Sequence, residues 1–366
     1  MDPSDDNVYR RERYRSLDVL RGCAIISMIQ AHVFLLSTTS GLMDILSTLL
    51  MPSFFFVMVA GTSFDLLMAS RKRRMASAFD IRLEVLLRGG VLLSVDLIML
   101  LFGSIVWPSQ YSFGLYWGVF EVIAVGYLLG LILPRSLLSK ILSITFLLAT
   151  ILLIETISLN TPLMDSLKDL LPMLLFFQLG RVMHDLYYNN EDRTFSMLRR
   201  GGLIVPLVFF FLGYLIAYWC NPDRSNLEWI IESNGLHSIA VIFGNILLLY
   251  HIFAVIVDRH GIRARTLHIV ERIGRISFSI FFLHIAVIYL VRLLLEALGL
   301  DEILPFTSPL WNIVTLISLV LAFYFLERWW ALRQYRYGFE WVLRRVPDYA
   351  IKLKAKGRHS DNLSSD

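Results

Sequence analysis

Three ionisable side chains lie in the first apolar stretch of the chain, Asp18, Arg21 and His32. Arg21 and His32 are eleven residues apart, about three helical turns, so both project from one face of a helix with ~16 Å between their levels. Asp18 lies one turn before Arg21 on nearly the same stripe. An imidazole can remove a proton near neutral pH, and a guanidinium binds anions such as phosphate. The stretch therefore combines a candidate base with a candidate anion-binding group.

The composition indicates that this stretch crosses a membrane. Hydrophobic residues make up 56% of the 366 residues, the mean hydropathy is +0.62, and 17% of residues are charged, whereas about a quarter is usual in soluble domains. Ten apolar runs are long enough to cross about 30 Å of hydrocarbon, and they extend over Leu17 to Ser37, Asp44 to Ala69, Arg82 to Val106, Leu115 to Leu133, Leu137 to Leu159, Leu167 to Tyr187, Gly202 to Cys220, Leu236 to Val257, Ser277 to Leu298 and Pro309 to Trp330. The sequence predicts an all-α polytopic membrane protein, a bundle of about ten transmembrane helices. Ionisable groups inside such helices are functional candidates because they are costly in lipid.

Basic residues predict how the bundle is oriented. Lys and Arg of short loops concentrate on the cytoplasmic side of a membrane. Basic clusters occur before the first predicted span and after the second, fourth, sixth, eighth and tenth, whereas the alternate loops hold almost none. Both termini are therefore expected in the cytoplasm, and the chain is expected to be a multi-pass protein of the cell membrane.

The chain divides into three predicted parts. Residues 1–16 form a charged cytoplasmic segment, residues 17–330 the transmembrane domain, and residues 331–366 a basic cytoplasmic tail. Aromatic residues among the arginines of the tail favour a helix along the inner membrane interface, and the last dozen residues are expected to be disordered. The net charge of +4 and the pI near 9.0 come from flanks and loops. The expected partner is therefore the lipid bilayer and not nucleic acid.

Polar side chains of other spans extend the candidate site. With a rise of ~1.5 Å per residue, His32 lies ~22 Å from the inner face, and Asp96 and Glu121 reach a similar level. Glu121 would accept a hydrogen bond from the His32 ring and fix its tautomer. The chemistry that fits is acyl transfer from cytosolic acyl-CoA, in which Arg21, held by Asp18, grips the donor phosphates and His32 deprotonates the attacking hydroxyl or amine. His32 and Glu121 are thus the predicted catalytic residues.

Several motifs resemble the transmembrane acyltransferases. The Ser-Leu-Asp-x-Leu-Arg-Gly opening and the spacing from Arg21 to His32 resemble the first span of the acyltransferase 3 family, which O-acylates surface glycans, and of the heparan-alpha-glucosaminide N-acetyltransferase family. The stretches Pro52 to Ser63, Trp117 to Ile123 and Gly274 to His284 resemble later spans of this superfamily, and the tail is similar to that of an uncharacterised bacterial branch.

The resemblance implies an acyl-CoA donor, acetyl-CoA in the first instance, as a cosubstrate rather than a bound cofactor. It implies a hydroxyl or amino group of a sugar or surface glycan as the acceptor, so both O- and N-transfer stay open. Arg21 and His32 occupy the family's essential positions, and Asp18, Arg275 and His284 join Arg21 as residues expected to contact the donor.

Other interpretations stay open at this point. A proton-coupled or small-solute transporter is the main alternative, although transporters often show two related halves with broken helices and the prolines here fall mostly near span ends. A third interpretation is a membrane scaffold without catalysis, which would have no column of titratable groups from the basic inner face to His32. No His-x-x-x-His, Cys-x-x-Cys or Glu-x-x-His pair occurs, so no metal site is predicted. Structural roles are also possible, with Asp18 and Arg21 as an anchoring ion pair and Asp65 as a partner of the basic cluster from Arg71 to Arg74.

Overall fold

Helices make up the regular structure of this chain. The computed structural model describes residues 14–35, 51–73, 77–106, 118–157, 161–188, 204–220, 236–254, 257, 265–299 and 309–363. In chain order the helices are α2 (Arg15–Leu35), α4 (Pro52–Arg73), α5 (Ala78–Val106), α6 (Val119–Ile132), α7 (Leu137–Ile157), α8 (Pro162–Tyr187), α10 (Ile204–Cys220), α12 (Leu236–Phe253), α13 (Arg265–Arg275), α14 (Ser277–Ala297), α15 (Pro309–Leu332) and α16 (Phe339–Leu363). Within this part of the chain no strand is present, which confirms the predicted all-α fold.

Each of the ten predicted spans overlaps one of these helices. Among the described residues, four helices are long and apolar enough to cross a membrane, namely Pro52–Arg73, Leu137–Thr156, Ser277–Ala297 and Leu310–Leu332. Shorter apolar helices cover Val119–Ile132, Pro206–Ile216 and Ile239–Phe253. The number of ten spans and the cytoplasmic position of both termini stay predictions, and residues 1–13 of the expected N-terminal segment lie outside the described residues.

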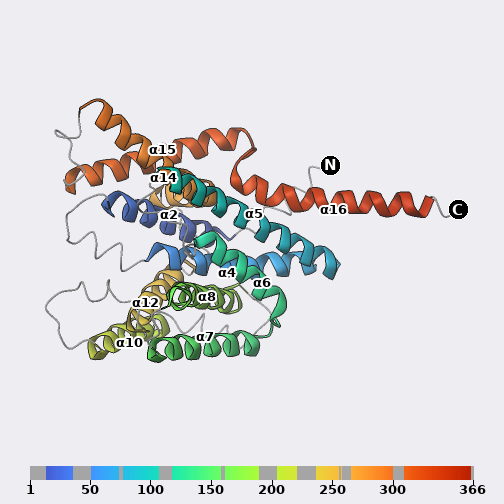
Figure 1. Cartoon of the computed structure of the whole chain (residues 1–366), viewed down its shortest axis with the longest axis horizontal. Helices are drawn as coiled ribbons and strands as arrows, with labels where there is room; N and C mark the ends of the chain where they lie inside the picture. The colour runs from blue at the N-terminus through green and yellow to red at the C-terminus, as the bar shows by residue number, and fades with distance from the viewer. Residues whose placement is uncertain are drawn as a thin grey trace.

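Helix α2 lies near the centre of the bundle. It packs against α4, α12, α13, α14 and α15, and Figure 1 shows it between α14 and α15 on one side and α4 and α12 on the other. Its apolar side chains are buried around the whole helix, as expected for a helix without a lipid- or solvent-facing stripe. Those with 0% exposure are Val19, Leu20, Ala24, Ile29 and Val33. The polar side chains of α2 are therefore surrounded by neighbouring helices.

One end of the bundle collects arginines. Helix α2 begins there beside the end of α8, since Ser16 Oγ lies 2.7 Å from the Tyr188 hydroxyl. Helix α4 ends there and α5 begins there, joined by an ion pair of 2.7 Å between Arg71 and Glu84. We call this the basic end. By the sequence-based prediction it is the cytoplasmic end.

Two glycines allow α2 and α13 to pack closely at the basic end. A Cβ atom on Gly274 would overlap the carbonyl oxygen of Asp18, and one on Gly22 would overlap that of Val270. The two backbones are thus in direct contact, which small residues at a helix crossing permit. This contact sets the position of Arg275, which follows Gly274, relative to Asp18.

Replacing Gly274 with alanine is expected to lower the stability of the folded protein. The added methyl group meets the Asp18 backbone, and overpacking of this kind costs ~1–3 kcal/mol. Gly90 of α5 is the matched control, because a Cβ atom there meets nothing within 4 Å, and alanine favours a helix over glycine by ~0.5–1 kcal/mol. Thermal unfolding of the purified variants measures the difference. Equal midpoints for Gly274→Ala and Gly90→Ala would contradict the close contact.

Two helices differ from the sequence-based expectation. The arginine-rich stretch before Ser277 lies between two predicted spans, yet its second half forms α13, which packs on α2 and whose Ile273 is buried. Helix α16 continues to Leu363, within the segment expected to be disordered.

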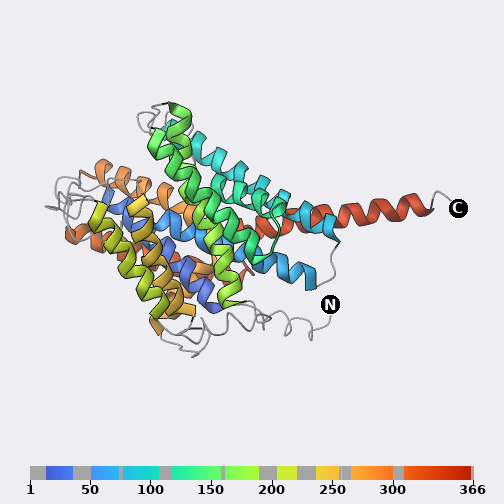
Figure 2. The same ribbon diagram turned by 90° about the horizontal axis from the view of Figure 1, so that it is seen from below.

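Helix α16, which is predicted to lie along the inner membrane interface, is held to the bundle at its start. It contacts α5 and α14, and Asp348 lies 3.5 Å from Arg71. Both views show the rest of the helix extending away from the bundle instead of lying across its end (Figures 1 and 2). The tail is thus anchored at its start and directed outward from the basic end.

Candidate functional site

The guanidinium of Arg21 is held by two neighbours at the basic end. Arg21 Nη1 donates to Asp18 Oδ1 at 3.3 Å, and Arg21 Nη2 donates to Ser63 Oγ at 2.5 Å. The Ser63 hydroxyl donates in turn to the Val59 carbonyl at 2.7 Å, so its lone pairs are available to Arg21. The Arg21 side chain is 26% exposed and that of Asp18 is 3% exposed. The Arg21 side chain is therefore fixed in direction but remains accessible to solvent. Its ion pair with Asp18 is as predicted.

Glu271 of α13 lies between two arginines beside this pair. Arg15 Nη2 donates to Glu271 Oε2 at 2.8 Å, and Arg275 Nη2 donates to Glu271 Oε1 at 2.5 Å. Burial alone would raise the pKa of Glu271, but the hydrogen bonds from both arginines outweigh it and hold the pKa below its ordinary value. Burial alone would lower the pKa of Arg275, but its hydrogen bond to Glu271 raises it. Because α13 touches α2 at Asp18, two cations and one carboxylate stand next to the Asp18 end of α2.

The imidazoles of His32 and His284 contact each other. His284 Nε2 lies 3.2 Å from His32 Nδ1, and the ring centroids are 4.9 Å apart with the planes at 65°. Each ring also contacts the carbonyl four residues earlier, His32 Nδ1 at 2.9 Å from Met28 O and His284 Nδ1 at 3.1 Å from Ile280 O. His284 is 1% exposed, and His32 is half-buried. Two candidate residues separated by 252 positions are thus brought together.

Phe281 packs against His284 and belongs to a group of three phenylalanine rings. The Phe281 centroid lies 5.8 Å from that of His284, 4.5 Å from that of Phe120 and 5.6 Å from that of Phe56. These three phenylalanines come from α14, α6 and α4, and all are buried. Such apolar surroundings exclude water and strengthen the polar contacts inside them.

Glu121 takes a different position from the one predicted. Its Oε2 accepts the N–H of Gly118 at 3.2 Å at the start of α6, and it lies beside the carboxyl group of Asp96 on α5. Among the described residues its carboxylate makes no hydrogen bond to His32, whose ring contacts His284 instead. The prediction of a hydrogen bond between Glu121 and His32 is therefore wrong. Equal depth in two helices does not bring two side chains together, because the helices must also face each other.

The six predicted site residues thus fall into three places. Asp18, Arg21 and Arg275 lie at the basic end, where α2 and α13 meet. His32 and His284 lie ~16 Å further along α2, about three turns from Arg21 on the same face. Glu121 stands apart with Asp96. The geometry therefore offers an anion-binding end and an imidazole pair along one side of one helix.

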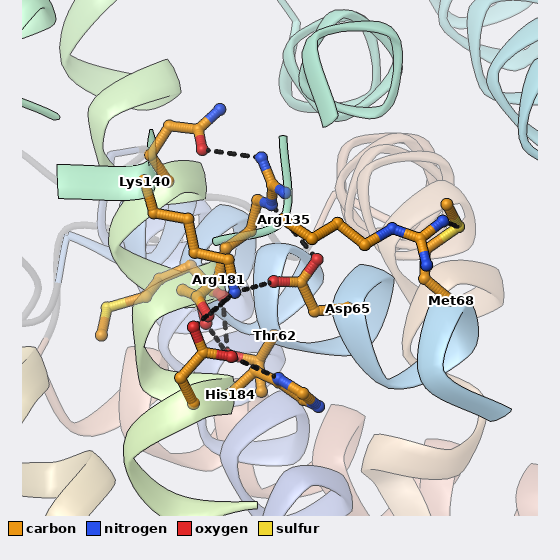
Figure 3. A network of polar contacts seen from close by, with 11 residues as sticks. Thr62, Asp65, Met68, Arg135, Lys140, Arg181 and His184 are labelled. Atoms are coloured by element: carbon orange, nitrogen blue, oxygen red, sulfur yellow. Dashed lines mark hydrogen bonds and ion pairs between the residues drawn. The ribbon is translucent and has the colours of Figure 1, made fainter. Parts of the chain in front are cut away.

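A second polar cluster lies buried between α4, α7 and α8, with Lys140 pointing between two carboxylates (Figure 3). The Lys140 ammonium lies 2.6 Å from both Asp65 Oδ2 and Asp185 Oδ2, and Arg181 Nε donates to Asp65 Oδ1 at 3.2 Å. His184 Nδ1 contacts Asp185 Oδ1 at 3.0 Å. Two carboxylates and two cations balance one another in charge, and all five side chains are buried.

The Lys140 ammonium lies among the oxygen atoms of this cluster that could otherwise bind a metal ion. Asp65, His184 and Asp185 bring three potential metal ligands within 4.8 Å of one another. Lys140 stands between the two carboxylates, donates hydrogen bonds to Asp185 Oδ2 at 2.6 Å and to the Arg181 carbonyl at 3.2 Å, and forms an ion pair with Asp65 Oδ2. The ammonium thus already has three oxygen partners within 3.2 Å. The cluster therefore works as a clamp between α4, α7 and α8.

Sequence reasoning missed the two cations of this clamp, Lys140 and Arg181. Pairing with the basic cluster from Arg71 to Arg74 is one of the roles that the sequence leaves open for Asp65, but Asp65 pairs with Lys140 and Arg181. Lys140 lies near the start of the fifth predicted span, Leu137 to Leu159, and counts in the sequence only toward the basic cluster that follows the fourth. Arg181 lies inside the sixth predicted span, and an ionisable residue in a span is the signal that would have found it.

Removing the Lys140 charge is expected to destabilise the protein strongly. Lys140→Met leaves two buried carboxylates facing each other with less compensation, and breaking a buried ion pair costs ~3–5 kcal/mol. Lys168→Met is the matched control, because Lys168 and Asp165 form an exposed pair of a kind worth ~0–1 kcal/mol. Unfolding midpoints of the two purified variants provide the test. A Lys140→Met midpoint as high as that of Lys168→Met would refute the clamp.

Comparison with known proteins supports the resemblance seen in the first span. Residues 14–329 match the acyltransferase 3 family, which is described as an acyltransferase domain. A comparison with curated proteins gave no match. The matched region runs from α2 into α15 and includes Arg21, His32, Arg275 and His284. The chain therefore belongs to the acyltransferase 3 family and is a membrane acyltransferase.

Proposed function

We propose that this protein transfers an acetyl group from acetyl-CoA to a hydroxyl or amino group of a sugar or surface glycan. The observation that carries the proposal is the placement of Arg21 and His32 on one side of α2, each held by its own partners. The donor would lie along this helix, with its phosphates at the basic end and its thioester at the histidine pair.

The charge at the basic end supports a phosphate-bearing donor. Arg21 is fixed by Asp18 and Ser63 but remains 26% exposed, and Arg275 is also 26% exposed. Guanidinium groups bind phosphate through two parallel hydrogen bonds, which are about twice as strong as hydrogen bonds between neutral groups. Coenzyme A carries three phosphate groups, so a fixed pair of arginines is suited to its head.

The reaction requires a base at the thioester. The acceptor oxygen or nitrogen attacks the thioester carbonyl carbon while His32 takes the proton of the attacking group. The new C–O or C–N bond forms, the C–S bond breaks, and the proton held by His32 returns to the departing thiolate, which leaves as free coenzyme A. His32 is half-buried whereas His284 is buried, so His32 is the imidazole that meets the substrates.

The basic residues favour entry of the donor from the cytoplasm. If the basic end faces the cytoplasm of a cell membrane, His32 lies nearer the opposite side. The acceptor would then approach from outside, which suits a surface glycan. The lipid bilayer is the surrounding partner in this arrangement.

Labelled acetyl-CoA tests the proposal directly. Purified protein is incubated with the label and a panel of amino sugars and surface glycans, and the acetylated product is separated and counted. Transfer by the wild type that is lost in both His32→Ala and Arg21→Ala supports the proposal. Proton-coupled solute uptake into liposomes without any transfer would instead support a transporter and overturn it.

A further inference from the structure

We propose that His284 is a positioning residue, which fixes the tautomer of His32 so that His32 Nε2 is the basic atom of the site. This inference rests on the proposed function for its kinetic consequence, but not for the tautomer itself. It differs from the sequence-based expectation, in which His284 contacts the donor.

The backbone carbonyls determine where the ring protons lie. A carbonyl oxygen can only accept, so a ring nitrogen in contact with one must carry the hydrogen. His284 Nδ1 lies 3.1 Å from Ile280 O and is therefore protonated. In the neutral ring this leaves the lone pair on His284 Nε2, the atom that faces His32.

The same reasoning applies to His32. Its Nδ1 lies 2.9 Å from Met28 O and 3.2 Å from His284 Nε2. Both of these atoms are acceptors, so the Nδ1 hydrogen of His32 is shared between them. The lone pair of neutral His32 is then on Nε2, on the opposite side of the ring. Two acceptors on one side thus select one tautomer.

His284 also supports the charge that His32 acquires during transfer. When His32 Nε2 takes the proton of the attacking group, the ring becomes an imidazolium with hydrogens on both nitrogens. Its Nδ1–H then donates to the lone pair of His284 Nε2 as a charge-assisted hydrogen bond. His284 is 1% exposed beside Phe281, so water does not replace this acceptor. The proton leaves again from His32 Nε2 to the thiolate.

Histidine ¹⁵N chemical shifts test the tautomer without any reaction. The spectrum of labelled protein is compared with those of His32→Gln and His284→Gln, which assign the two rings, and His251→Gln serves as a control. His251 is buried and contacts the Tyr187 hydroxyl, outside the proposed site. We expect His32 to show a protonated Nδ1 and an unprotonated Nε2. A protonated Nε2 in neutral His32 would overturn the inference.

Kinetics separate a positioning role from donor binding. His284→Leu is expected to lower kcat by roughly 10- to 100-fold, because it removes one hydrogen bond to a charged group. The KM for acetyl-CoA should change little. His284→Gln is expected to restore much of kcat, because its amide oxygen can accept the Nδ1–H of His32. His251→Gln checks that removing a buried histidine is not itself the cause.

The outcomes distinguish the inference from the proposed function. A rise in KM with kcat unchanged would place His284 at the donor and overturn the positioning role. Failure of His284→Gln to restore kcat, in protein that unfolds at the wild-type midpoint, would do the same. Wild-type protein that transfers no acetyl group to any acceptor would overturn the proposed function, while the ¹⁵N spectrum would still decide the tautomer.

Discussion

Replacing His32 with alanine is expected to lower kcat for acetyl transfer by ~10²- to 10⁴-fold, the usual contribution of a positioned general base. His32 is the half-buried member of the histidine pair, and its Nδ1 contacts Met28 and His284. This leaves Nε2 of His32 as the basic atom. Among the described residues that contact the histidine pair, no other side chain could take its place as a base. The KM for acetyl-CoA should change little, because the proposed phosphate site at Arg21 is about three turns away.

Initial rates of labelled product formation measure this effect, with folding followed by thermal unfolding. His251→Gln is the control for loss of a buried imidazole that contacts Tyr187. A His32→Ala variant that retains a tenth or more of the wild-type kcat would exclude His32 as the base. A variant that loses activity together with its folded structure would show that the ring is needed for packing, and would contradict the catalytic role.

Arg21→Ala is expected to have the second largest effect, on the donor instead of the base. Loss of a charge-assisted hydrogen bond costs ~1.5–3 kcal/mol, and we therefore expect the KM for acetyl-CoA to rise by roughly 10- to 100-fold. Arg21→Lys should recover part of this, because it keeps the charge but not the two-pronged geometry of the guanidinium. Steady-state kinetics over a range of acetyl-CoA concentrations give the KM of each variant.

The matched control for Arg21 is Arg82→Ala. Arg82 is exposed near the start of α5, so this change removes one positive charge from the basic end without touching α2. Its effect on KM should be small, since exposed charges are screened by salt. If both alanine variants raise the KM equally, the donor is attracted by the general charge of this end and Arg21 has no specific role.

The positions of the helices could be predicted because they follow from hydrophobicity along the chain. All ten predicted spans overlap a helix. Helix α13 was missed because its several arginines make the stretch too polar to be recognised as a span. It nevertheless packs on α2, and its Ile273 is buried. Where α16 points depends on its contacts with α5 and α14, which no local pattern encodes.

The site could be predicted only within one helix. Helical periodicity alone places Asp18, Arg21 and His32 on one side of α2, and the ion pair between Asp18 and Arg21 is present. The partner of His32 depends on which helix faces it, and this made the prediction of Glu121 wrong and left His284 unassigned as a partner. Depth in the membrane can be counted along a sequence, but the facing direction of two helices requires their packing.

A structure of the protein bound to a thioether analogue of acetyl-CoA tests the central claim most directly, because the analogue cannot transfer its acyl group. The phosphates are predicted to lie at Arg21 and Arg275, and the sulfur next to the His32 Nε2 atom, with the arm of the analogue following α2. An analogue whose sulfur lies away from His32, or whose phosphates lie at the opposite end of the bundle, would contradict transfer along this helix.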